Sequence, residues 1–188
     1  MTATRSLYAI DDSPARYAAP LRWLHWIIAL LVVGLLFVGG WLKYFEPPDG
    51  PFKEFLYEMH ESTGMTLWVL VLLRIVVRLA TGAPKLPGNT PAGVRLIATL
   101  NHVALYLVLL VQPIVGLMDA NAWGAPLHWY GLFVVPSPIG KQPDPVAQNF
   151  SDLHWWGAAT LLFLLAMHLL GAGYHGFIRR DGVIRHML

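Results

Sequence analysis

Two histidines, His154 and His168, lie fourteen residues apart within one apolar stretch. Fourteen residues advance an α-helix by about 21 Å and return it to within about 40° of its starting direction. One helix therefore presents two imidazoles on the same face, one toward each side of a bilayer whose core is about 30 Å thick. Imidazole inside hydrocarbon usually marks function. The spacing predicts a stacked pair of metal cofactors, for which haem is the first candidate.

The composition predicts an integral membrane protein. Of the 188 residues, 56% are hydrophobic and 13% are charged, whereas a soluble domain carries about a quarter charged residues. Cysteine is absent, which excludes disulfides, iron–sulfur ligation, thiolate zinc sites and covalently attached c-type haem. The lysines and arginines border apolar runs and form no basic face interleaved with aromatic residues, so we expect no nucleic-acid partner.

Four apolar segments approach or reach the length of about 20 residues that crosses a bilayer. They cover about 21–43, 56–79, 95–118 and 152–177. We therefore predict an all-α fold, an integral membrane four-helix bundle that forms a single membrane domain over 1–188. The connection over about 119–151 is long and contains aromatic residues among several prolines, which is typical of a functional or interfacial segment.

The distribution of charge predicts the orientation of this bundle. Ten basic residues flank one side of the four spans and three flank the other, Lys43, Lys53 and Lys141. Because Lys and Arg are enriched in cytoplasmic loops, both termini are predicted to be cytoplasmic and the 119–151 connection periplasmic. The ten basic residues are Arg5, Arg16, Arg22, Arg74, Arg78, Lys85, Arg95, Arg179, Arg180 and Arg185. Besides marking topology, one or two of four arginines are expected to pair with haem propionates: Arg22, Arg74, Arg78 and Arg179.

The predicted orientation gives each residue a depth in the membrane, and four histidines form two pairs at matching depth. His25 and His168 fall toward the cytoplasmic side, whereas His60 and His154 fall toward the periplasmic side. Paired imidazoles on facing helices hold a six-coordinate haem, while zinc or copper would need more ligands gathered at one depth. A lone membrane histidine can simply form a hydrogen bond across helices. Two pairs at matched depth favour the cofactor.

Three glycines follow these histidines on or beside the same helix face: Gly64, Gly157 and Gly171. They would leave room for a flat macrocycle, although small residues also let membrane helices pack closely.

Two further histidines are candidates for chemistry near the cytoplasmic side. His175 follows His168 by seven residues, and a group that titrates near neutrality there could relay protons to a quinone. The alternative is a histidine that stabilises the last carbonyls of a helix. His102 enters the third span; it would contact propionates or a quinone, or replace His25 or His168 as a ligand.

Motifs along nearly the whole chain, about residues 16–187, resemble the bacterial cytochrome b561 family. They are Arg22-Trp23-Leu24-His25-Trp26, His60-Glu61-Ser62-Thr63-Gly64, His102-Val103-Ala104-Leu105-Tyr106, and His168 with His175 and Arg179-Arg180-Asp181-Gly182-Val183. The resemblance implies a multi-pass cytochrome of the bacterial inner membrane with two haem b groups, which exchanges electrons with quinone. Its haem ligands would be His25 with His168 and His60 with His154.

The resemblance leaves the electron donor open. Some members of this family resemble superoxide oxidases, which pass an electron from periplasmic superoxide to ubiquinone. Eight of the eleven acidic residues fall on the predicted periplasmic side. Their negative charge creates an electric field that repels an anion such as superoxide. The chain would therefore be a superoxide:ubiquinone oxidoreductase, or an electron-transfer subunit that anchors a periplasmic dehydrogenase or hydrogenase. A third possibility is a haem-free transporter in the lipid bilayer whose histidines relay protons.

Overall fold

Four long helices form the bundle in the computed structural model, which describes residues 16–84, 87–88 and 90–188. They are α1 (Ala19–Phe45), α2 (Pro51–Thr81), α3 (Ala92–Ala122) and α4 (Asp144–Gly173). Each is long and apolar enough to cross a membrane, which confirms the predicted all-α, four-helix membrane fold. Arg5 and Lys85, two of the predicted topology markers, lie outside the described residues.

Helices α1, α2 and α3 extend beyond both ends of the apolar segments that predicted them, whereas α4 begins earlier than predicted and ends at Gly173, about four residues sooner. Helices α1, α2 and α4 have proline at their first or second position, where its missing N–H has no helical partner to lose. The largest difference is at α4, which begins at Asp144 rather than near 152. The first turns of α4 are polar, so hydropathy alone places the helix start too late. Ser151 therefore lies inside the helix, where its hydroxyl donates to Asp119 on α3 at 2.6 Å.

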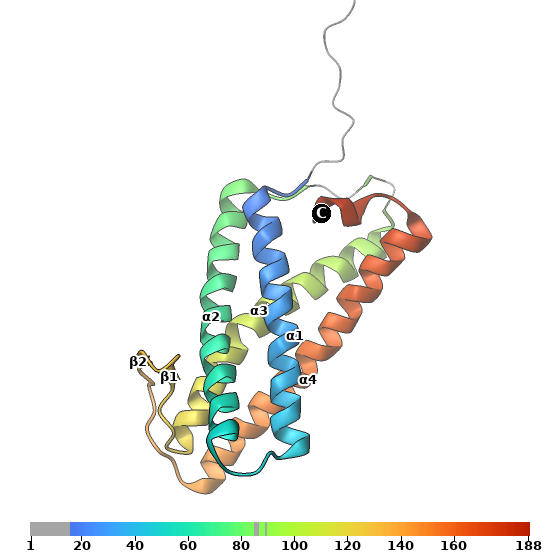
Figure 1. The fold of residues 1–188 in the computed structure, drawn as a ribbon. Coiled ribbons are helices and arrows are strands. Elements are labelled where there is room, and N and C mark those ends of the chain that lie inside the picture. The colour runs from blue at the N-terminus through green and yellow to red at the C-terminus, as the bar shows by residue number, and fades with distance from the viewer. Residues whose placement is uncertain (1–15, 85–86, 89) are drawn as a thin grey trace, which may run out of the picture.

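The chain beyond α4 returns across the start of α1. Helix α4 continues as a π-helical turn, η1 (Tyr174–Arg179), and a 3₁₀ turn follows, η2 (Val183–His186). The amide of Tyr17 donates to the carbonyl of His186 at 3.1 Å, and the indole of Trp26 donates to that of Met187 at 3.0 Å. The described chain thus begins and ends at one end of the bundle, called here the termini end (Figure 1).

The opposite end carries a small antiparallel hairpin of β1 (His128–Trp129) and β2 (Phe133–Val134). Its anchor is Ser62 on α2, whose side chain is fully buried. The Ser62 hydroxyl accepts from the amide of Tyr130 at 2.8 Å and donates to the carbonyl of His128 at 3.1 Å. The hairpin therefore packs on α2 close to His60, and this end is called the hairpin end (Figure 1).

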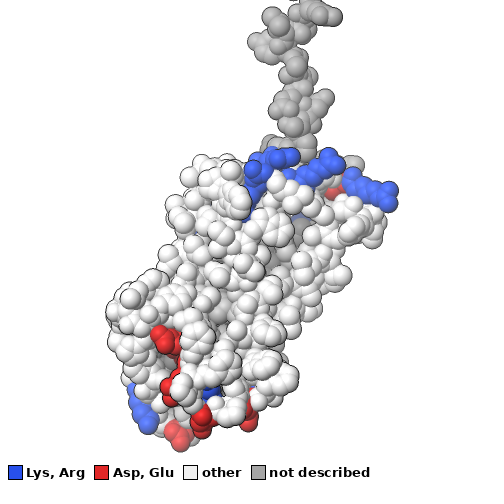
Figure 2. All heavy atoms as spheres, viewed as in Figure 1, with Lys and Arg blue, Asp and Glu red and all other residues white. Residues whose placement is uncertain are grey.

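The outer faces of the helices are apolar and the middle of the bundle contains a core. Five buried side chains form that core: Ile28, Val32, Leu67, Val71 and Leu161. Large apolar residues cover the outside, so the protein contacts lipid. Charges are confined to the two ends, with Lys and Arg gathered at the termini end and Asp and Glu mostly at the hairpin end (Figure 2).

Candidate functional site

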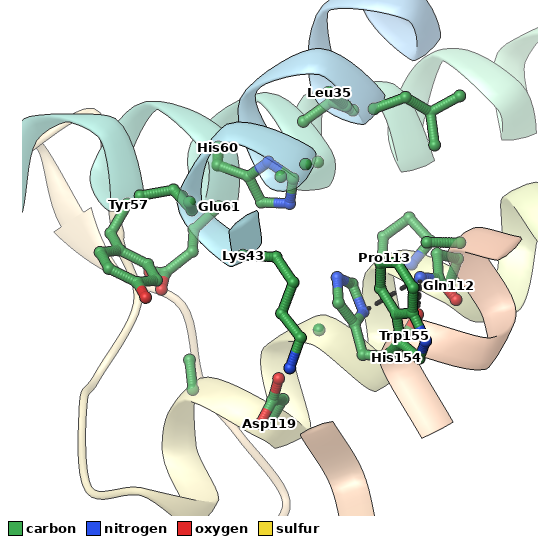
Figure 3. Close-up of a pocket in the computed structure, with 18 of the residues that line it drawn as sticks. Leu35, Lys43, Tyr57, His60, Glu61, Gln112, Pro113, Asp119, His154 and Trp155 are labelled. Atoms are coloured by element: carbon green, nitrogen blue, oxygen red, sulfur yellow. Dashed lines mark hydrogen bonds between the residues drawn. The ribbon is translucent and has the colours of Figure 1, made fainter. Parts of the chain in front are cut away.

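At the hairpin end, His60 on α2 faces His154 on α4. Their ring centroids are 6.2 Å apart and the ring planes are 81° apart. Figure 3 shows the two rings among the side chains that line a pocket, with Lys43 pointing toward Asp119. The pocket has a volume of about 1980 Å³ and is lined by all four helices. We call these two residues the hairpin-side pair.

At the termini end, His25 on α1 faces His168 on α4. Their ring centroids are 6.1 Å apart and the planes are 65° apart; these two residues form the termini-side pair. A third imidazole, His102 on α3, lies 5.3 Å from that of His168. The Nδ1 atom of His102 donates to the carbonyl of Ala98 at 2.6 Å, which leaves its Nε2 atom free.

Both pairs have the separation that a shared metal requires. A metal–imidazole bond is about 2 Å long and the ring centre lies about 1 Å behind the nitrogen, so two opposed ligands place their centroids about 6 Å apart. The separations of 6.2 and 6.1 Å agree with this. The 5.3 Å between His102 and His168 is too short for opposed ligation, which favours His25 as the partner of His168.

The described residues contain no group of three or more His, Asp or Glu side chains that could hold a metal ion. Two imidazoles alone leave a six-coordinate metal four ligands short. A planar macrocycle supplies four ligands from one plane, as in haem. The donor set at each pair therefore fits haem iron and fits a bare metal ion poorly.

Glycines on the neighbouring helices make room for the hairpin-side rings. A Cβ atom on Gly39 of α1 would lie 3.0 Å from Cε1 of His60, and one on Gly116 of α3 would lie 2.9 Å from Cε1 of His154. Contacts this short require the ring or the backbone to move. Sequence reasoning missed both glycines, although they follow His25 and His102 by the same fourteen residues that separate His154 from His168.

The three glycines proposed from the sequence behave differently from one another. A Cβ atom on Gly64 or Gly171 would meet no heavy atom within 4 Å, so open space adjoins both. One on Gly157 would instead overlap the side chain of Gln112. The missing side chain of Gly157 therefore leaves space for Gln112, and this glycine does not border free space for a macrocycle.

Gln112 on α3 holds the ring of His154 in place. Its amide nitrogen donates to the backbone carbonyl of His154 at 2.6 Å and lies 3.2 Å from Nδ1 of the same residue (Figure 3). Contacts to the outer nitrogen of a ligating histidine fix the ring orientation. Sequence reasoning did not find Gln112, because nothing in the order of residues indicates which polar side chain of α3 meets α4.

Each helix carries two site positions separated by fourteen residues. They are His25 and Gly39 on α1, His60 and Arg74 on α2, His102 and Gly116 on α3, and His154 and His168 on α4. The hairpin-side layer thus contains two histidines and two glycines. The termini-side layer contains three histidines and an arginine, so the two layers differ in charge and polarity.

His175 lies in a buried polar cluster at the termini end. Its side chain is 6% exposed, and its Nδ1 atom donates to Oδ2 of Asp181 at 2.7 Å. Arg179 donates to the same oxygen at 3.0 Å. Burial alone would raise the pKa of Asp181, but hydrogen bonds from His175, the Val183 amide and Arg179 outweigh it and hold that pKa below 3.8. His175 also lies in the π-helical turn, and such turns often occur at functional sites.

Comparisons with known proteins agree on one family. The model of the family described as "Prokaryotic cytochrome b561" matches residues 16–188. "Cytochrome b561 homolog 2" of Escherichia coli K12 is 32% identical over 184 residues, which cover 96% of this chain and 95% of the relative. "Cytochrome b561 homolog 1" of the same organism is 25% identical, covering 92% and 97%. The "Probable superoxide oxidase CybB" of Yersinia pestis is 26% identical, covering 88% and 91%.

Proposed function

The chain belongs to the prokaryotic cytochrome b561 family, and we propose that it transfers electrons across the bacterial inner membrane with two haem b groups, one at each histidine pair. The family accounts for haem b and for electron transfer in a membrane. The observation that supports two sites is the pair of ring separations, 6.2 and 6.1 Å, at opposite ends of one bundle.

The histidines would hold the group and the surrounding residues would shape its site. Haem b, when bound, would supply one-electron chemistry, and the two imidazoles of each pair would hold it. His154 and His168 lie about 21 Å apart along α4 by helix rise, and the apolar core includes Leu161, midway between them in the sequence. Gln112 orients His154, and Gly39 and Gly116 allow both hairpin-side rings to take their positions.

The termini end is proposed to face the cytoplasm. It carries most of the arginines (Figure 2), and positive charge beside membrane spans is enriched on the cytoplasmic side. In this orientation the hairpin-side pair lies toward the periplasm and receives electrons from a donor there.

The proposed electron acceptor is a quinone, ubiquinone by resemblance, at the termini end. Reduction of a quinone consumes protons as well as electrons. Asp181 accepts from Nδ1 of His175 at 2.7 Å, which fixes the ring tautomer and leaves Nε2 to exchange a proton. His102, whose Nδ1 is engaged by a backbone carbonyl, is the second polar side chain proposed to contact the quinone.

Two observations bear on the donor. Acidic residues border the mouth of the hairpin-side pocket, among them Glu61 and Asp119, and Lys53 there is paired with Asp49 at 2.7 Å. Such a field repels superoxide. The hairpin also exposes Leu132 (72%) and Phe133 (55%), which suits contact with a periplasmic redox protein. We therefore propose a protein donor first, and direct oxidation of superoxide as the alternative.

A reduced-minus-oxidised spectrum of the purified protein, with haem counted per chain, tests the proposal. We expect two b-type haems, one of them lost or altered in His60→Ala and the other in His168→Ala. The matched control is His186→Ala, since that histidine lies in η2, outside the residues that line the pocket, and should leave both haems in place. A colourless protein would instead favour the haem-free transporter, and one haem indifferent to both substitutions would refute the proposed pairing of the histidines.

A further inference from the structure

Arg74 is a buried cation with neutral hydrogen-bond partners near the termini end of the bundle. Its side chain, on α2, is 7% exposed. Its Nε atom donates to the hydroxyl of Tyr106 at 3.1 Å, and another guanidinium N–H donates to the carbonyl of Leu21. Among the described residues, no acidic side chain forms an ion pair with it. A buried charge without a counter-charge is costly to maintain in such a setting and usually has a function.

The partners of Arg74 place it beside the termini-side pair. Leu21 lies one helical turn from His25 on α1, and Tyr106 lies one turn from His102 on α3. The guanidinium charge interacts electrostatically with the imidazoles of His25, His102 and His168. Its positive charge therefore acts on the space between His25 and His168.

Among the described residues, no buried arginine lies beside the hairpin-side pair. Its layer contains Gly39 and Gly116 at the corresponding positions of α1 and α3. Two lysines line its pocket: Lys43, whose amino group points toward Asp119 in Figure 3, and Lys53, which is paired with Asp49 at 2.7 Å. Glu61 lines the same pocket. The charges around this pair are mixed, whereas no acidic side chain among the described residues pairs with Arg74 beside the termini-side pair.

We propose that Arg74 makes the termini-side site the easier of the two to reduce and thereby favours inward electron transfer. This inference rests on the proposed function, since it requires a redox group at each pair. An arriving electron lowers the charge of the site by one, so a nearby buried cation stabilises the reduced form; no bond is made or broken. The electron comes from the hairpin-side site, which is oxidised as the termini-side site is reduced.

Spectroelectrochemical titration of the purified, haem-loaded protein tests this without measuring activity. A His60→Ala background removes the hairpin-side site, so the remaining midpoint potential belongs to the termini-side site. At this site we expect Arg74→Gln to lower the equilibrium constant for reduction at least tenfold, which lowers the midpoint potential by 59 mV for one electron. Arg74→Lys and Tyr106→Phe keep the positive charge and should therefore shift the midpoint potential far less.

Arg78→Gln is the matched control, because it removes the same charge one turn along α2. Arg78 donates to the hydroxyl of Tyr17 at 3.1 Å and is less buried than Arg74, so its loss should shift the potential less. An equal shift from both variants, or none from Arg74→Gln, would refute the proposal.

The unaltered protein provides a second test that does not depend on any variant at Arg74. Its higher midpoint potential must belong to the termini-side site, as assigned with His60→Ala. If the higher potential belongs to the hairpin-side site, the proposal is wrong, even though two haems per chain would still support the proposed function.

Discussion

At the scale of single residues, the glycines that face the hairpin-side imidazoles leave little room for a side chain. We predict that Gly116→Ala displaces the ring of His154, because a Cβ there would lie 2.9 Å from Cε1. Overpacking of this kind costs about 1–3 kcal/mol. Haem content and the low-spin spectrum of the hairpin-side site should both fall. Gly93→Ala is the control on the same helix, since its Cβ would meet nothing within 4 Å.

A result in which Gly93→Ala and Gly116→Ala are equally harmless would mean that the ring of His154 has room to move. The contact in the structure would then have no role in holding the hairpin-side site.

The residue scale also shows what a single sequence can and cannot reveal. The pairing of His25 with His168 and of His60 with His154 follows from orientation and depth, and the structure brings both pairs together. Arg74 was also within reach, because it follows His60 by the same fourteen residues. Gln112 was not, since its contact with His154 depends on how α3 crosses α4.

Among the elements, the hairpin depends on one buried hydroxyl of α2. Ser62→Ala would leave the amide of Tyr130 and the carbonyl of His128 without their partner, which costs about 1–3 kcal/mol for a buried group. We predict faster amide hydrogen exchange over 127–135 with the bundle unchanged. Thr63→Ala is the control, because Thr63 contacts only the exposed hydroxyl of Tyr130 at 3.3 Å. Equal exchange in both variants would contradict this anchoring.

The tail after α4 is predicted to depend on pH through Asp181. Its pKa is lower in the folded protein than its ordinary value of 3.8. The stabilisation it provides is therefore present above pH 3.8 and is lost as pH falls through the folded pKa. Limited proteolysis of 174–188 should increase across that acid range in the unaltered protein. Asp181→Asn should be cleaved readily at neutral pH, with little further change on acidification.

The elements differ in how far hydropathy could predict them. The four spans were predictable because lipid requires long, continuous apolar helices. The start of α4 was not, since its first two turns are polar and continue the helix beyond the apolar segment. The hairpin was not predictable either, because it depends on contacts with Ser62, which lies 66 and 68 residues away along the chain from His128 and Tyr130.

For the whole molecule, the asymmetry of charge and the asymmetry of the two sites lead to the same direction of transfer. The basic end is proposed to face the cytoplasm, and Arg74 lies beside the histidine pair nearer that end. If the chain were inserted the other way, the more easily reduced site would face the periplasm and quinone reduction would take its protons from there. The orientation is therefore the premise on which the proposed direction depends.

Because the chain has no cysteine, single cysteines can report this orientation directly. Gly140→Cys lies at the hairpin end, where a side chain would meet nothing within 4 Å, and Leu188→Cys is exposed at the termini end. We predict that a membrane-impermeant maleimide added to intact spheroplasts labels Gly140→Cys and leaves Leu188→Cys unlabelled until the membrane is permeabilised. The opposite pattern would place the arginine-rich end in the periplasm. The electric field of Arg74 would then draw electrons outward, away from the proposed acceptor side.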